Sequence, residues 1–106
     1  MDAQKLVYLS QLYDLYHPLL TDKQRTIAEA TFSNDLSLSE IADALSITRS
    51  GVQDHLQKAI QKLEDAEIAL GFLKRVKAQE SLIDSLESTE LTAKQQALID
   101  QLKDVM

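Results

Sequence analysis

The sequence predicts an all-α protein: a wing-free helix-turn-helix core with preceding helices and a C-terminal helical extension. The chain of 106 residues contains only two glycines and one proline, so few residues interrupt helices. Apolar residues recur at spacings of three and four, the period of an α-helix. Three segments also begin with the Ser/Thr-x-x-Glu/Gln capping box, which starts helices. Together these observations favour helices joined by short connections.

A first helix is predicted over residues 2–17. Asp2 is a candidate N-cap, and Pro18 ends the helix because proline has no amide hydrogen and clashes with the preceding turn. One broad face carries the side chains expected to be buried, which are Leu6, Leu9, Leu12, Tyr13 and Tyr16. Because only Lys5 lies near the tyrosine cluster of Tyr8, Tyr13 and Tyr16, the rings are interpreted as packing residues and not as a platform for RNA.

A second helix is predicted over residues 22–32, opened by the capping box of Thr21 and Gln24. Its inward candidates are Ile27, Ala28, Thr31 and Phe32. A polar turn follows at residues 33–35. Leu36 and Leu38 are then expected to return the chain to the core.

Residues 37–63 are predicted to form the helix-turn-helix. Ser37 and Glu40 make a second capping box, and Ala42 lies where the two helix axes approach most closely, so that a larger side chain there would force them apart. The corner consists of residues 46–48. Ser46 occupies the corner position that favours glycine because it requires a positive φ, while Ile47 is expected to be buried and Thr48 to cap the next helix.

The second helix of the motif has an apolar face of Val52, Leu56, Ile60 and Leu63. Ile41 and Leu45 on the first helix face the same angle between the helices. No helix breaker follows until Gly71, so this helix is predicted to continue to Leu70.

Two further helices are predicted, at 72–88 and at 92–105, the latter opened by a third capping box of Thr92 and Gln95. Their apolar stripes comprise Leu73, Val76, Ile83 and Leu86 on the first and Leu98, Ile99 and Leu102 on the second. The basic group Lys74, Arg75 and Lys77 is interpreted as a solvated helix face. We therefore divide the chain into a helix-turn-helix domain at 1–70 and an extension at 71–106, expected to form a homodimer through apolar stripes that so small a domain does not cover alone.

The charge composition limits the possible functions. Seventeen acidic and eleven basic residues give a net charge of −6, whereas nucleic-acid binding is driven by clustered Lys and Arg. The chain has no cysteine, and its two histidines, His17 and His55, have no neighbouring ligands at metal-binding spacing. We expect no enzyme, no cofactor and no metal. In the absence of a long apolar run or a leader peptide, the expected location is the cytoplasm, without membrane insertion.

The runs LLTDKQRTI at 19–27 and DLSLSEIADALSITRSGVQDHL at 35–56 resemble region four of bacterial primary sigma factors and the related LuxR-type output domains. With the leader LYDLYHPLLTDKQ at 12–24 and its helical tail, the whole chain resembles more closely the YlxM-type helix-turn-helix proteins. The genes of that family commonly lie beside those of the signal recognition particle GTPases, so the resemblance implies a regulatory or accessory role in that pathway. Where the family usually has Arg-Gln-Ala, this chain has Arg49, Ser50 and Gly51.

Docking of the motif in the major groove would use the second helix's face opposite Val52 and Leu56. The candidate nucleic-acid-binding residues there are Thr48, Arg49, Ser50, Gln53, Gln57 and Lys58. Arg49 suits a guanine edge and Gln53 an adenine, while Lys62 would add a backbone contact and Asp54 opposes all of them. Two hypotheses follow: a duplex-DNA-binding regulator, or an acidic protein-interaction module that binds a signal recognition particle component without contacting DNA.

Overall fold

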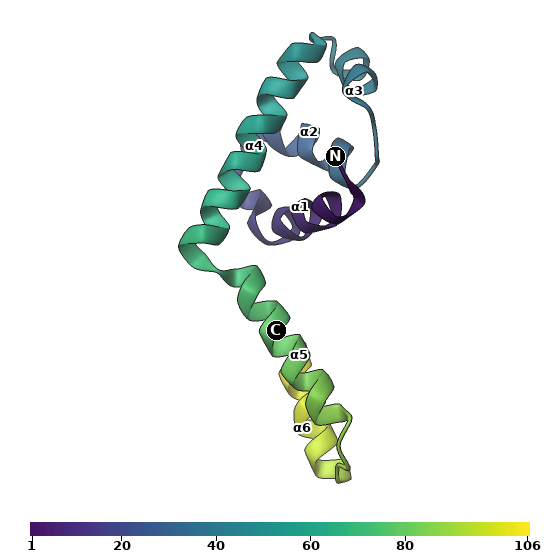
Figure 1. The fold of residues 1–106 in the computed structure, drawn as a ribbon, viewed down its shortest axis with the longest axis vertical. Coiled ribbons are helices and arrows are strands. Elements are labelled where there is room, and N and C mark those ends of the chain that lie inside the picture. The colour runs from purple at the N-terminus through teal and green to yellow at the C-terminus, as the bar shows by residue number, and fades with distance from the viewer. The chain divides into compact units, whose positions relative to one another are not determined.

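A computed structural model describes residues 1–106, and the chain is all-helical, as the sequence predicts (Figure 1). The elements are α1 (Ala3–Tyr16), the 3-10 helix η1 (His17–Leu19), α2 (Asp22–Phe32), α3 (Leu38–Leu45), α4 (Arg49–Leu70), α5 (Phe72–Glu87) and α6 (Ala93–Asp104). They divide into two compact units, Met1–Gly71 and Phe72–Met106. None of the helices combines the length and the apolar character needed to cross a membrane.

The predicted helix starts are confirmed by their hydrogen bonds. The Asp2 carboxylate accepts from the Lys5 amide at 2.8 Å at the start of α1. Both partners of each capping box are in place: residues 21 and 24 start α2, 37 and 40 start α3, and 92 and 95 start α6. At the other end of α4, Gly71 adopts a left-handed conformation with φ 65°. The side chains of the capping residues therefore satisfy backbone amides that the first turn of each helix leaves free.

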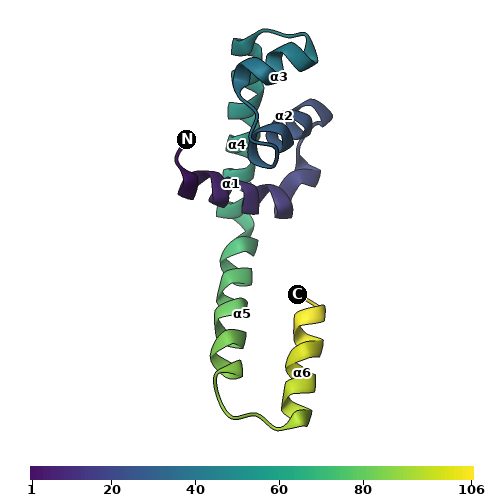
Figure 2. The same cartoon turned by 90° about the vertical axis from the view of Figure 1, so that its right-hand side faces the viewer.

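The core of the first unit forms around α4, which contacts α1, α2 and α3 (Figure 2). The largest side chains that are fully buried come from all four helices and comprise Leu9, Leu12, Ile27, Ile41, Val52 and Leu63. Five of the residues predicted for the core of this unit's helices and their connections are only half-buried, namely Leu6, Thr31, Leu36, Leu38 and Leu45. They lie near the ends of helices or in connections, where fewer neighbouring elements cover them.

Two of the three tyrosines in α1 belong to this core, as the sequence indicates. Tyr16 is buried and donates its hydroxyl to the Glu67 carboxylate on α4 at 2.7 Å. Tyr13 packs edge-on against Phe32 on α2, and burial raises the pKa of its hydroxyl, as do the Glu29 carboxylate and its hydrogen bond to Tyr13. Only Tyr8 is exposed. Tyr13 and Tyr16 therefore fasten α1 to its neighbours, whereas the predicted packing role does not hold for Tyr8.

The corner between α3 and α4 follows the prediction at two of its three positions. Ser46 has φ 55° and ψ 42°, and the Thr48 hydroxyl accepts from the Gly51 amide at 3.0 Å. The prediction for Ile47 was wrong, because its side chain is half-buried and not buried. The corner lies at the end of the unit, away from α1, so few side chains cover it (Figure 1).

Replacing Ser46 by glycine is expected to raise the free energy of unfolding by about 1 kcal/mol, because glycine adopts φ 55° without the Cβ clash that serine has there. Urea denaturation of the two proteins would measure the difference. Ser39→Gly, at an exposed position inside α3, should instead lower it by a similar amount. A loss of stability in Ser46→Gly would contradict the left-handed conformation.

The second unit is a hairpin in which α5 and α6 run antiparallel (Figure 2). Glu87 joins the two helices, since its carboxylate accepts from Lys103 at 2.7 Å and from Gln96 at 3.0 Å. Both hydrogen bonds lower the pKa of the Glu87 carboxyl, and the bond from Lys103 has the larger effect. Of its predicted stripes, only Leu73, Ile83 and Ile99 are buried.

Candidate nucleic-acid interface

The helix-turn-helix is held together by the buried sides of α3 and α4, which contact each other. On α3, Ile41 and Ala42 are 2% and 6% exposed, and on α4 Val52 is fully buried. The small side chain of Ala42 allows the close approach of the helices. This packing directs the opposite side of α4 to solvent.

The six predicted contact residues lie together on that exposed side of α4. Thr48 is the N-cap and Arg49 the first helical residue. Because residues four apart on a helix are neighbours, Arg49, Gln53 and Gln57 form one row and Ser50 and Lys58 lie in the adjacent one. The name contact face is used below for Thr48, Arg49, Ser50, Gln53, Gln57 and Lys58.

The two cations of the contact face differ in whether a carboxylate pairs with them. Lys58 forms an ion pair with Asp54 at 3.0 Å, with both side chains about three-fifths exposed. Arg49 forms no ion pair. Lys62, which was expected to add a contact to the nucleic-acid backbone, donates from its ammonium to the Gln24 side chain on α2 at 3.2 Å. Arg49 is therefore the cation that the face presents without a neutralising carboxylate.

Gln24 is a structural residue whose second role the sequence does not reveal. Its side-chain oxygen accepts from the Thr21 amide at 3.0 Å, as the capping box predicts, and also from Lys62. It is 7% exposed. The bond to Lys62 joins positions 38 residues apart, so no local pattern could have indicated it.

Gly51, the departure from the usual family pattern, has a structural reason. A Cβ at this position would lie 3.0 Å from the Thr48 hydroxyl oxygen, the same atom that accepts from the Gly51 amide. Glycine lowers the helix propensity of the first turn by roughly 0.5 to 1 kcal/mol, but it leaves room for the cap. The N-terminus of α4 is thus supported by Thr48.

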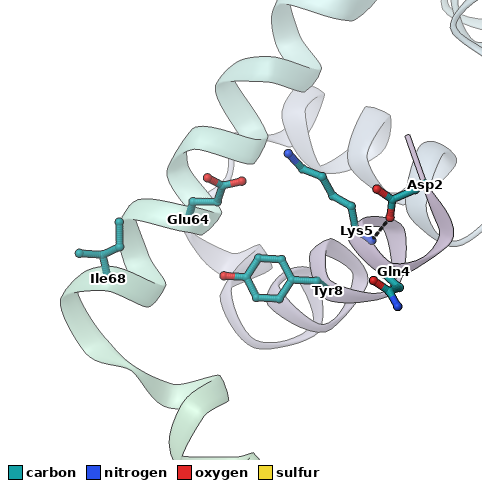
Figure 3. A pocket seen from close by; sticks show the side chains of 6 residues that line it. All are labelled: Asp2, Gln4, Lys5, Tyr8, Glu64 and Ile68. Carbon is teal, nitrogen blue, oxygen red and sulfur yellow. Dashed lines mark hydrogen bonds between the residues drawn. The ribbon is translucent and has the colours of Figure 1, made fainter.

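A hollow of about 450 Å³ lies between α1 and α4 (Figure 3). It is lined by Asp2, Gln4, Lys5, Tyr8, Glu64 and Ile68. Burial raises the pKa of the Tyr8 hydroxyl, and the carboxylates of Glu67 and Glu64 raise it further. Ile68 is 83% exposed, so the hollow combines acidic and apolar groups.

Comparison with known proteins agrees with this architecture. Residues 3–105 match the family model described as "Putative helix-turn-helix protein, YlxM / p13 like". The UPF0122 protein of Listeria innocua is 34% identical over 103 residues, which cover 97% of this chain and 92% of that protein. The UPF0122 protein of Mycoplasma capricolum is 37% identical over 103 residues, covering 97% and 89%.

A UPF0122 protein of Thermoanaerobacter is 49% identical over 69 residues, 65% of this chain, and the match spans only 59% of that relative's length. The resemblance to sigma factor region four stays an expectation, whereas the resemblance to the YlxM-type proteins is confirmed. The chain belongs to the UPF0122 family of YlxM/p13-like helix-turn-helix proteins.

Proposed function

We propose that this protein is a DNA-binding regulatory protein of the cytoplasm that binds duplex DNA through the contact face and acts as a homodimer. The observation that carries the proposal is the exposure of Arg49, without an ion pair, in a row with Gln53 at the start of the second motif helix. The N-terminal part of this helix is the part that enters the major groove in helix-turn-helix proteins. Membership of a helix-turn-helix family supports the same function.

Each residue of the contact face has a role that its chemistry suits. The Arg49 guanidinium offers two parallel donors to a guanine edge, and the Gln53 amide matches the donor and acceptor of adenine. The hydroxyls of Thr48 and Ser50 and the Lys58 ammonium contact phosphates. Gln57 lies one turn beyond Gln53 and extends the row of amides. A dimer doubles these contacts over two half-sites.

A salt series tests this function. The net charge of −6 opposes approach to DNA, so we expect binding that is detectable at low salt and falls steeply as salt rises. Only the Lys and Arg contacts release counterions, so the two cations of each subunit's contact face, Arg49 and Lys58, correspond in a dimer to a slope of at most roughly −4 in the logarithm of affinity against the logarithm of salt. Pooled genomic duplex fragments serve as the ligand. Failure to bind any fragment at low salt would exclude the function.

Asp54→Asn is expected to strengthen duplex binding by about three- to tenfold at low salt, because it releases Lys58 and removes a negative charge from the contact face. Asp65→Asn is the matched control. It makes the same charge change on the same helix, but Asp65 lies about three turns further on, where it accepts from Gln61. Equal gains in both variants would indicate a general charge effect and contradict a localised contact face.

The second candidate function is an acidic protein-interaction module that binds a basic partner. The hollow between α1 and α4 favours it, because its two carboxylates, Asp2 and Glu64, outnumber its one cation, Lys5, and the exposed Ile68 lies beside them (Figure 3). Such a site suits a cationic, amphipathic segment. The resemblance to YlxM-type proteins directs the choice of partner to a signal recognition particle component.

A pull-down with the particle's GTPase and its RNA tests this second candidate. Glu64→Gln should reduce capture if the hollow binds the partner, while Asp65→Asn, outside the hollow, should not. Failure to enrich either component would count against the module. Capture of the partner with no binding to DNA would select it over the first proposal.

A further inference from the structure

A five-residue motif occurs once in each helix of the C-terminal hairpin. It reads LIDSL at 82–86 in α5 and LIDQL at 98–102 in α6. The isoleucines, Ile83 and Ile99, are buried at 4% and 7% exposure. The four leucines are exposed: Leu82 by 67%, Leu86 by 47%, Leu98 by 58% and Leu102 by 46%. In each motif the hairpin therefore buries the isoleucine and leaves both leucines exposed to solvent.

The four leucines lie on one face of the hairpin. In each motif they occupy the position before the isoleucine and the position three after it, so they project to one side of the buried residue. The helices run antiparallel (Figure 2). Two antiparallel helices that carry the same motif are related by an approximate two-fold axis normal to the pair, which places both leucine pairs on the same side. This set, Leu82, Leu86, Leu98 and Leu102, is called the leucine face below.

The hairpin has few means of stabilising itself. Its buried apolar side chains are Leu73, Ile83 and Ile99. Units below roughly 40 residues usually depend on disulfides, metals or association with another chain. The chain has no cysteine, and no group of three or more potential metal ligands is present. Association with another chain would cover the leucine face and supply the missing burial.

We propose that the leucine face binds the leucine face of a second copy of this chain, forming an isologous four-helix bundle from two hairpins. An identical layer of two helices matches it in length and in the spacing of its leucines. The outer flank of each motif carries an uncharged residue, Ser85 or Gln101, and the nearest charge on that side is Lys94, one turn before Leu98. The face is therefore mainly apolar, and apolar contact dominates the choice of partner. The inference extends the dimer of the proposed function, but it depends only on the hairpin.

Sedimentation of the full chain without DNA tests the proposal. We expect a dimer that dissociates in the micromolar range, and the double variant Leu82→Gln/Leu98→Gln should be a monomer up to about 200 μM. The matched control is Ser81→Gln/Ala97→Gln, which places the same side chain at exposed positions one residue earlier in each helix. These positions project away from the leucine face, so the control should remain a dimer.

Two results would overturn the proposal: a native chain that is monomeric at about 200 μM, or a dimer that survives both the Leu82→Gln/Leu98→Gln and the Leu86→Gln/Leu102→Gln changes. Far-UV circular dichroism confirms that the variants keep their helices. The second pair tests the same face if the first pair loses helix. The sedimentation experiment contains no DNA, so its result does not depend on whether the chain binds DNA. If the chain proves to be monomeric, the DNA contact of Arg49 can still be tested separately.

Discussion

Arg49→Ala is expected to weaken duplex DNA binding by about five- to 150-fold, the effect of losing a bidentate contact worth roughly 1 to 3 kcal/mol. The residue is exposed at the start of α4 and forms no ion pair, so its loss should not disturb the fold. Fluorescence anisotropy with a selected duplex, at several salt concentrations, measures the change. The preference among sequences should also relax at the position that Arg49 contacts.

Arg49→Lys separates the charge of this residue from its geometry. Lysine keeps the positive charge but lacks the planar pair of donors. We expect the salt dependence to persist while discrimination between sequences declines. Lys23→Ala, which removes a charge at an exposed position on α2, should alter affinity much less. Equal effects of Lys23→Ala and Arg49→Ala would show that only the total charge matters.

Ala42→Leu is expected to lower the free energy of unfolding by about 1 to 3 kcal/mol and to abolish duplex binding. Ala42 is 6% exposed on the side of α3 that packs against α4. Three added carbon atoms do not fit without separating the two helices, and the contact face depends on their angle. Urea denaturation and the same anisotropy assay measure the two effects.

Ala44→Leu provides the control for this change because it places the same side chain at an exposed position of α3. It should leave both the stability and the binding nearly unchanged. Full stability in Ala42→Leu would contradict close packing of α3 on α4. A stable Ala42→Leu protein that still bound DNA would also remove the link between helix packing and the contact face.

Much of the fold could be predicted because its signals are local. A capping box connects residues three apart, and Thr21, Ser37 and Thr92 each begin a helix where the box indicates. Gly71 and Ser46 adopt the left-handed conformation that ends a helix. Such interactions form within one turn of chain, so a short stretch of sequence contains all the groups involved.

The exposure of the candidate residues could be predicted from the sequence, but the pairing of their charges could not. The 3.6-residue period places the contact face opposite Val52 and Leu56, and the structure agrees with that arrangement. The period does not show where a flexible lysine directs its ammonium. Lys58 pairs with Asp54, and Lys62 binds Gln24 across the interface with α2. Only the side-chain contacts in the structure therefore show which cations of α4 have no partner within the protein.

The sequence by itself determined the helices, their ends and the helix-turn-helix corner, because caps, turn conformations and periodicity act between residues at most four apart. Only the tertiary structure decided which apolar residues are covered. LIDSL and LIDQL present the same pattern in the sequence, yet Ile83 and Ile99 are buried while the adjacent Leu82 and Leu98 remain exposed. Burial depends on which helix faces meet, and that choice is made by the packing of segments far apart in the chain.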